Sequence, residues 1–161
     1  MARNPQAPRS PPSGRKPLKL TQEALAPLVD CTARTARLAA RRLTAFYDAR
    51  LAQTGLSIAQ FGLMAQIAGA EDAALGALAD RMGLEASTLT RNLQALAREG
   101  LAEIVTAGSD QRRRTVRLTQ KGEHALAAAL PVWAKAQAEA AAVVDAKALR
   151  TIARNTRKLP V

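Results

Sequence analysis

The fold is decided by two consecutive segments, Leu75-Gly-Ala-Leu-Ala-Asp-Arg-Met-Gly83 and Ala86-Ser-Thr-Leu-Thr-Arg-Asn-Leu-Gln-Ala-Leu-Ala-Arg98. Apolar residues recur at three- and four-residue steps in both, which predicts one helix from Leu75 to Met82 and another from Ala86 to Arg98. Gly83 provides a tight turn between them, and Gly100 stands where a left-handed helix cap belongs. Two short helices joined across a glycine turn predict a helix-turn-helix.

Two short strands are expected directly after this motif. Residues Leu101–Thr106 and Arg114–Leu118 are rich in strand-forming side chains, and the second segment alternates, with Val116 and Leu118 on one face. The polar stretch 107–113 between them predicts a hairpin tip. A helix-turn-helix followed by a hairpin predicts a winged helix.

Helical periodicity also flanks the winged helix on both sides. One long helix is expected from about Leu25 to Leu51, and Ser57 with Gln60 predicts a capping box for the next. A long helix is expected from Thr119 towards Val144, with a last helix capped by Asp145 and reaching Lys158. Alanine occupies 12 of the 28 positions from 121 to 148, which favours close helix packing between subunits.

The predicted fold class is therefore mostly α, a winged helix-turn-helix with a helical dimerisation region. Four parts are expected: a disordered, basic, proline-rich arm (1–20), a first dimerisation helix (21–56), the winged helix-turn-helix (57–120) and C-terminal dimerisation helices (121–161). The arm carries five prolines and five cations with no acid, so it cannot bury enough apolar surface to fold. Both non-specific DNA attraction and a solubilising tail would explain it.

Composition narrows the possible functions. The formal net charge is +11, and 18 of the 24 cations are arginine, which favours a polyanionic partner such as double-stranded DNA. Aromatic residues make up 2% of the chain, too few for single-strand stacking platforms. The single cysteine and single histidine predict neither a disulfide framework nor a metal site, and no cofactor is expected. Without an apolar run of membrane-spanning length or a signal peptide, we expect a cytoplasmic protein with no membrane partner.

The helix 86–98 is the predicted DNA-recognition helix. Its leucines fall on one side, and the opposite side is polar and free of acids, which suits the major groove because Arg can contact guanine and Gln can contact adenine. Hydroxyls at the helix N-terminus would favour a phosphate there. The DNA-binding candidates on this helix are Ser87, Thr88, Thr90, Arg91, Gln94 and Arg98.

The hairpin tip is the second DNA-binding candidate. Asp110 is followed by three consecutive arginines, Arg112, Arg113 and Arg114, which repel one another unless an anion lies nearby. A hairpin tip can insert an arginine into a minor groove, whose negative potential favours it. Asp110 is expected to pair with a neighbouring arginine and fix the loop.

Together these motifs resemble the MarR family of bacterial transcriptional regulators. The resemblance is carried by the segment 75–83, by Ser87-Thr-Leu-Thr-Arg-Asn-Leu93, by Gly100-Leu101, by Asp110-x-Arg112 and by Leu118-Thr-x-x-Gly122, and spans about residues 25 to 158. It implies a homodimer built from the first and last helices, two winged helices on a pseudo-palindromic operator, and repression relieved by a small aromatic or anionic ligand. It also implies that Asp110 and Arg112 form the wing signature, and that the region contacting bases and phosphates contains Ser87, Thr88, Thr90 and Arg91. Glu85 departs from the pattern, because Asp or Ser would cap this helix better.

An effector site is less well defined by the sequence. The resemblance places the ligand pocket between the dimerisation helices and the winged helix. Arg34, Arg37 and Arg41 recur at helical spacing and would receive a carboxylate or phosphate, although a solvated face explains them too. Tyr47, Phe61 and Met64 would line an aromatic pocket, and core packing explains them equally well.

The sequence leaves two further alternatives, a redox-sensing regulator and an architectural DNA-binding protein, and it argues against an enzyme. Cys31 would act as a redox sensor if Arg34 and Arg37 stabilised its thiolate, whereas a packed cysteine would be inert. An architectural protein that binds DNA without sequence preference is a further alternative, although it leaves the pattern of Arg91 and Gln94 unexplained. An enzyme is not expected, because the chain lacks a glycine-rich phosphate loop, a histidine paired with a nucleophile and clustered carboxylates.

Overall fold

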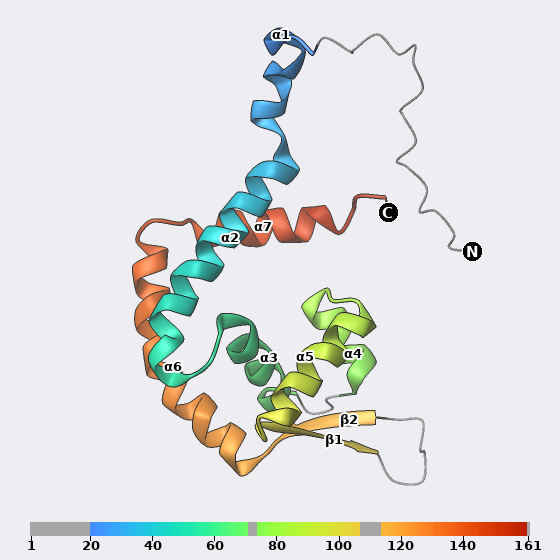
Figure 1. The fold of residues 1–161 in the computed structure, drawn as a ribbon, viewed down its shortest axis with the longest axis vertical. Helices are drawn as coiled ribbons and strands as arrows, with labels where there is room; N and C mark the ends of the chain where they lie inside the picture. The colour runs from blue at the N-terminus through green and yellow to red at the C-terminus, as the bar shows by residue number, and fades with distance from the viewer. Residues whose placement is uncertain (1–19, 71–73, 107–113, 161) are drawn as a thin grey trace, which may run out of the picture. The chain divides into compact units, whose positions relative to one another are not determined.

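The computed structural model describes residues 20–70, 74–106 and 114–160, and these are mostly helical with a two-stranded antiparallel sheet (Figure 1). The chain divides into two compact units, Met1–Ala39 and Ala40–Val161. The described helices of the second unit include the predicted helix-turn-helix. No helix in the described ranges combines the length and the apolar character that a membrane span requires.

The predicted continuous helix from Leu25 to Leu51 is wrong at its N-terminal end. The structure has a short helix α1 (Gln22–Leu25), a 3-10 helix (Ala26–Asp30) and only then α2 (Thr32–Leu51). Pro27 explains why α1 does not continue, because proline lacks an amide hydrogen to donate to the preceding turn. Proline is tolerated in the first turn of the 3-10 helix, so it does not explain the second break. Cys31 lies at the break, where its extended backbone separates the two helical segments.

The entry into α3 (Ile58–Ala68) confirms the predicted capping box. The Ser57 hydroxyl accepts from the Gln60 amide nitrogen at 3.2 Å, and the Gln60 side chain accepts from the Ser57 amide at 3.0 Å. A further cap comes from α2, since Asp48 Oδ1 accepts from the Ile58 amide at 2.7 Å. Three free N–H groups at the start of α3 are thereby satisfied by side chains.

The predicted helix-turn-helix forms with the expected bounds. Helix α4 (Leu75–Met82) ends at Gly83, whose φ of 61° is the left-handed conformation that glycine adopts without strain. Helix α5 (Ala86–Arg98) follows, and Gly100 has a φ of 69° just beyond it. The glycine turn therefore sets the angle between two short helices, as the sequence predicted.

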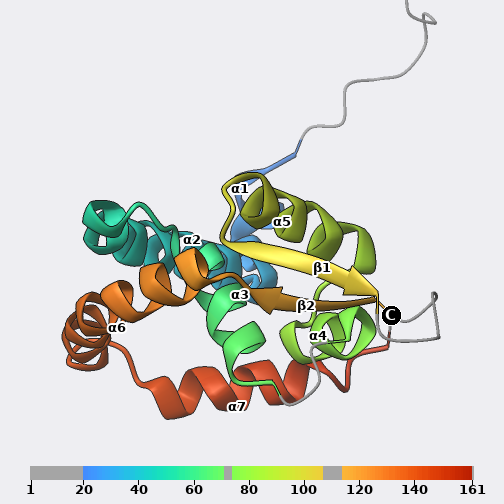
Figure 2. The same ribbon diagram turned by 90° about the horizontal axis from the view of Figure 1, so that it is seen from below.

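The hairpin completes the winged helix. Strand β1 (Ala102–Thr106) begins one residue later than predicted, and β2 (Arg114–Leu118) has the predicted bounds. The strands pair antiparallel, with Ile104 opposite Val116. Helix α5 packs beside β1, while α3 and α4 pack on β2 (Figure 2).

Two C-terminal helices follow the hairpin. Helix α6 (Gln120–Ala141) is capped by the Thr119 hydroxyl and continues through Pro131, but it ends before the predicted Val144. Helix α7 (Ala146–Thr156) begins at the predicted cap, since Asp145 accepts from two amides of its first turn. None of the residues of α7 is buried.

The core of the second unit lies among the C-terminal end of α2, α3, α4, α5, the hairpin and α6. Its largest fully buried side chains come from four helices and are Leu51, Leu63, Met64, Leu78, Leu89, Leu93 and Leu96. Burying each leucine stabilises the fold by about 1.5–3 kcal/mol before the entropy of ordering is counted. This core fixes α5 relative to the hairpin.

Candidate nucleic-acid interface

Helix α5 separates a buried face from a polar exposed face. Leu89, Leu93 and Leu96 are at most 1% exposed and hold the helix on the core. The candidates on the opposite side, Ser87, Arg91, Gln94 and Arg98, are all exposed, whereas Thr88 and Thr90 are half-buried at the margins. The structure therefore brings the predicted recognition residues of α5 together on one accessible face.

The two arginines of this face have no carboxylate partner among the described residues. Arg91 Nε donates to the Ser87 carbonyl, and Arg98 Nε donates to the Gln94 carbonyl, each at a long 3.4 Å within the same helix. The Thr90 hydroxyl donates to the Ala86 carbonyl at 2.8 Å. Since neither guanidinium is neutralised by a described group, both charges remain available to an anion.

The N-terminus of α5 lacks a side-chain cap, as the sequence indicated for Glu85. Glu85 occupies the cap position, but its side chain accepts no amide hydrogen bond. The Thr88 amide donates to the Glu85 carbonyl at 2.9 Å, which leaves the Ala86 and Ser87 amides without a cap beside the Ser87 hydroxyl. Uncapped N–H groups at the positive end of a helix are a ready site for a phosphate.

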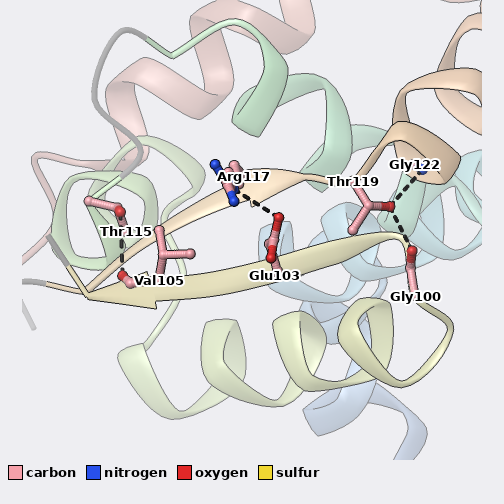
Figure 3. Close-up of polar contacts among 7 residues, drawn as sticks. All are labelled: Gly100, Glu103, Val105, Thr115, Arg117, Thr119 and Gly122. Carbon is pink, nitrogen blue, oxygen red and sulfur yellow. Dashed lines mark hydrogen bonds and ion pairs between the residues drawn. The ribbon is translucent and has the colours of Figure 1, made fainter.

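One arginine of the hairpin is neutralised and another is free. Arg117 Nε donates to Glu103 Oε1 across the strands at 2.8 Å, and the Thr115 hydroxyl donates to the Val105 carbonyl at 3.4 Å (Figure 3). Arg114, at the start of β2, is exposed and pairs with no described carboxylate. Of these two arginines, only Arg114 has a charge that no described carboxylate neutralises, so Arg114 is the better candidate for a phosphate contact. The sequence alone does not predict the ion pair between Arg117 and Glu103, because the pairing depends on the register of the two strands.

A polar cluster at the base of the hairpin fixes its position. The Thr119 hydroxyl donates to the Gly100 carbonyl at 2.6 Å and accepts from the Gly122 amide at 3.1 Å (Figure 3). Lys121 Nζ donates to the Glu99 carbonyl at 2.7 Å, which holds the end of α5 against the start of α6. The residues that follow α5 are thus joined to the start of α6, at the base of the hairpin, by short hydrogen bonds.

The remaining candidates of the wing tip lie outside the described residues. Asp110, Arg112 and Arg113 fall in the segment 107–113, and the predicted basic arm falls, apart from Leu20, in residues 1–19. Their assigned roles stay predictions.

The candidate ligand residues fall into two groups. Arg34, Arg37 and Arg41 are exposed along α2, and Tyr47 is half-buried, with its hydroxyl donating to Gln137 Oε1 at 2.8 Å. Phe61 and Met64 are core residues at 4% and 0% exposure, and Phe61 stacks on Trp133 with ring centroids 5.5 Å apart. In the second unit, Tyr47 lines a groove of about 300 Å³, whose other lining residues are Leu43, Gln137, Ala140, Ala141, Val144, Ala146, Leu149 and Arg150.

The redox candidate has a different environment from the one its periodicity suggested. Cys31 is half-buried and follows a 3-10 helix, whereas the sequence pattern placed it on the apolar face of a continuous helix. The thiol is thus partly accessible. A sensing role stays a prediction.

The winged helix of this chain has close counterparts among solved structures. MosR, a transcriptional regulator of M. tuberculosis crystallised in complex with DNA, is 37% identical over 81% of this chain and 100% of its own, with a TM-score of 0.72. MarR from E. coli, as a mutant complexed with operator DNA, shares the fold at 21% identity, 84% and 99% coverage and a TM-score of 0.69. PcaV from Streptomyces coelicolor, in complex with its natural ligand, shares it at 19% identity, 81% and 92% coverage and a TM-score of 0.68.

Two other comparisons complement these structures. No curated protein matches the chain. The family model described as the MarR family matches residues 54–113, a range that includes α3, α4, α5 and β1. Because this match covers the helix-turn-helix and the 37% identity to MosR extends over 81% of the chain and all of MosR, the chain belongs to the MarR family of transcriptional regulators.

Proposed function

We propose that this protein is a homodimeric, site-specific DNA-binding repressor that a small ligand releases from its operator. One observation carries the proposal: the exposed face of α5 presents Arg91, Gln94 and Arg98 without any acid, beside a hairpin held at a fixed position. An Arg and a Gln on such a face are the side chains that read guanine and adenine in a major groove. The complex of MosR with DNA, from a relative at 37% identity, supports the same assignment.

The proposed DNA contacts divide by role. Arg91 and Gln94 read base edges, while Ser87, Thr88 and Thr90 position the helix N-terminus at the backbone. Arg98, Arg112, Arg113 and Arg114 contact phosphates or a minor groove, and Asp110 fixes the hairpin tip. Of these side chains, Arg91 offers the sharpest test because its loss should affect one base position.

The homodimer is supported by apolar residues that the single chain leaves uncovered. Leu149 and Ile152 on α7 are 37% and 51% exposed, although they lie on the apolar side of an otherwise polar helix. We propose that residues 21–56 and 121–161 form the dimerisation region around this surface. A twofold pairing would place two α5 helices about one DNA turn, roughly 34 Å, apart.

Ligand release is supported by the groove that Tyr47 lines and by the PcaV structure with its natural ligand. A ligand that binds more tightly when the two winged helices are spread shifts the population away from the spacing of successive major grooves. The arginines Arg34, Arg37 and Arg41, which do not line this groove, are proposed separately as anion contacts along α2. Phe61 and Met64 would contribute only if the core opened around them, because both are buried.

The experiment selects duplexes from a random library with the purified protein and compares Arg91→Ala with Arg42→Ala. Arg42 is an exposed arginine of α2 with no assigned DNA contact. Arg42→Ala therefore removes the same charge at a position away from the proposed interface. The parent should select an inverted repeat, and Arg91→Ala should cost about 1–3 kcal/mol and relax one position in each half-site. Arg42→Ala should keep the parental preference.

Other outcomes contradict the proposal. If the parent enriches no sequence, and salt weakens its binding to all duplexes equally, the protein is an architectural DNA-binding protein. An Arg91→Ala protein with unchanged preference would show that Arg91 does not read a base.

A further inference from the structure

The excess positive charge of the chain does not reside in the winged helix. Residues 57–120 contain seven arginines and seven carboxylates, so the formal charge of this segment is zero. The winged helix therefore attracts an anion only through the places where its arginines lie apart from its carboxylates. The segment 121–161, by contrast, carries a formal net charge of +4, seven cations less three acids.

Most of that C-terminal charge follows α7. Lys147, Arg150, Arg154 and Arg157, which we call the α7 stripe, recur at three- and four-residue steps. At about 100° per residue they fall within an arc of roughly 80°, and Leu149 and Ile152 lie on the far side. Lys158 follows directly, and no acid occurs between Ala146 and Val161.

The stripe is exposed and its charges have no described partner. All four side chains are exposed, and within the described ranges none of them forms an ion pair with a carboxylate. The nearest acid in sequence, Asp145, is used as the cap of α7, accepting from the amides of Lys147 and Ala148 at 2.8 and 3.1 Å. The stripe therefore presents four uncompensated cations along one side of a helix.

Helix stability does not explain this arrangement. Cations favour the C-terminal end of a helix, which accounts for Arg154 and Arg157. Lys147 and Arg150 lie in its N-terminal half, Lys147 in the first turn, where the helix dipole disfavours a positive charge, and like charges three or four residues apart repel. An arrangement that is unfavourable within the helix is consistent with an external anion.

We propose that the α7 stripe binds the phosphate backbone of a second DNA duplex while the winged helices hold the operator. From Lys147 to Arg157 the stripe is about 15 Å long, a length over which a duplex presents roughly nine phosphate charges. Arginine forks and lysine ammonium groups both fit phosphate oxygens. Contacts to the backbone carry no base information, so we expect binding to the stripe to be independent of sequence.

A membrane surface fits the helix less well than a duplex. Interfacial helices insert a broad apolar face that commonly includes aromatic residues, whereas α7 contains no aromatic residue. Its larger apolar side chains, Leu149 and Ile152, are those assigned above to the dimer. The stripe lies on the other side of α7, so a second copy that covers these two side chains need not cover the stripe. The inference rests on the proposed function only in taking the operator to be the DNA that the winged helices bind.

The test is a bridging assay with full-length protein. A duplex selected by the protein is immobilised, and retention of a fluorescent random-sequence duplex is measured with and without protein. The variant is Arg154→Gln with Arg157→Gln, leaving Arg150 unchanged because it also lines the groove. The matched control is Arg42→Gln with Lys135→Gln, two exposed cations outside the stripe.

The parent and the control should retain the second duplex, and the Arg154/Arg157 variant should lose at least about tenfold of this retention. In the same variant, the log–log salt slope of retention should fall by about 0.9 for each lost phosphate contact. Binding to the immobilised duplex should stay parental. Arg154→Lys with Arg157→Lys should restore retention, because it restores the charge.

Other results overturn the inference. Unchanged retention in the Gln variant would assign the second duplex to another surface. Loss of both duplexes would place the stripe at the first DNA site, and capture of phosphatidylserine vesicles in preference to DNA would make the partner a membrane. If the parent selects no sequence, site-specific function fails, yet two random duplexes in the same assay still test the stripe.

Discussion

Gly122, in the first turn of α6, lies directly against the backbone carbonyl of Leu101 at the start of the hairpin. The space that a Cβ at position 122 would need is already occupied by this carbonyl, and the neighbouring backbone atoms of Leu101 are also close. Thr119 strengthens the same junction by bonding both Gly100 and Gly122 (Figure 3). Thus the segment Leu118-Thr-x-x-Gly122, which helped to indicate the family, is where the hairpin joins α6.

Substituting Gly122→Ala should therefore destabilise the protein by about 1–3 kcal/mol, because the obstructing group is backbone and cannot rotate away. The free energy of unfolding is measured by urea titration. Gly76→Ala is the matched control, since Gly76 is exposed in α4 and a Cβ there meets nothing within 4 Å. The control should gain about 0.5–1 kcal/mol from the lower entropy of its unfolded chain. If both substitutions stabilise the fold, the close contact between Gly122 and Leu101 is absent.

The sequence predicted the helix-turn-helix closely because the signals there are local. Apolar spacing placed α4 and α5, and the glycines at 83 and 100 mark backbone that is left-handed in the structure. The start of the first helix was wrong because apolar periodicity carries no signal for the extended backbone of Cys31, which separates the 3-10 helix from α2.

The candidate site was predictable only in part, since contacts distant in sequence give no periodic signal. Periodicity placed Arg91, Gln94 and Arg98 on the exposed face of α5, but the same spacing could not distinguish a pocket from the core for Phe61 and Met64. The cap that Asp48 provides for α3 also went unpredicted. Such contacts depend on how helices pack, which a single sequence does not encode locally.

Arg114 and Arg117 should respond differently to removal, although both belong to β2. Arg114 is unpaired among the described residues, whereas Arg117 is neutralised by Glu103 at 2.8 Å. Arg114→Ala should lower the log–log salt slope of DNA binding by about 0.9 if it contacts one phosphate. Arg117→Ala should change the slope much less. Binding isotherms across a salt series make the comparison, and equal slopes in both variants and the parent would remove Arg114 from the interface.

Ile152→Asp should shift the protein from dimer to monomer. Ile152 is 51% exposed on the apolar side of α7, so an aspartate leaves the monomer folded but places an unpaired charge in the proposed dimer contact. Sedimentation velocity at matched concentrations measures the change. Asn155→Asp adds the same charge at an exposed polar position of α7 and should remain dimeric. A parent that sediments as a monomer, or an Ile152→Asp protein that stays dimeric, would contradict the assigned interface.

Asp48 links α2 to the winged helix through the first amide of α3. Its Oδ1 accepts from the Ile58 amide at 2.7 Å, a charge-assisted bond in a half-buried position. Asp48→Ala should cost about 1–2 kcal/mol, within the range measured for lost helix caps, and Asp48→Asn should recover much of this loss because the amide oxygen still accepts. Asp80→Ala, at an exposed position of α4 where the structure describes no hydrogen bond to the carboxylate, should change stability by less than about 0.5 kcal/mol. Thermal unfolding of the four proteins tests the order, and an Asp48→Ala protein as stable as the parent would show that the Ile58 amide is satisfied without this carboxylate.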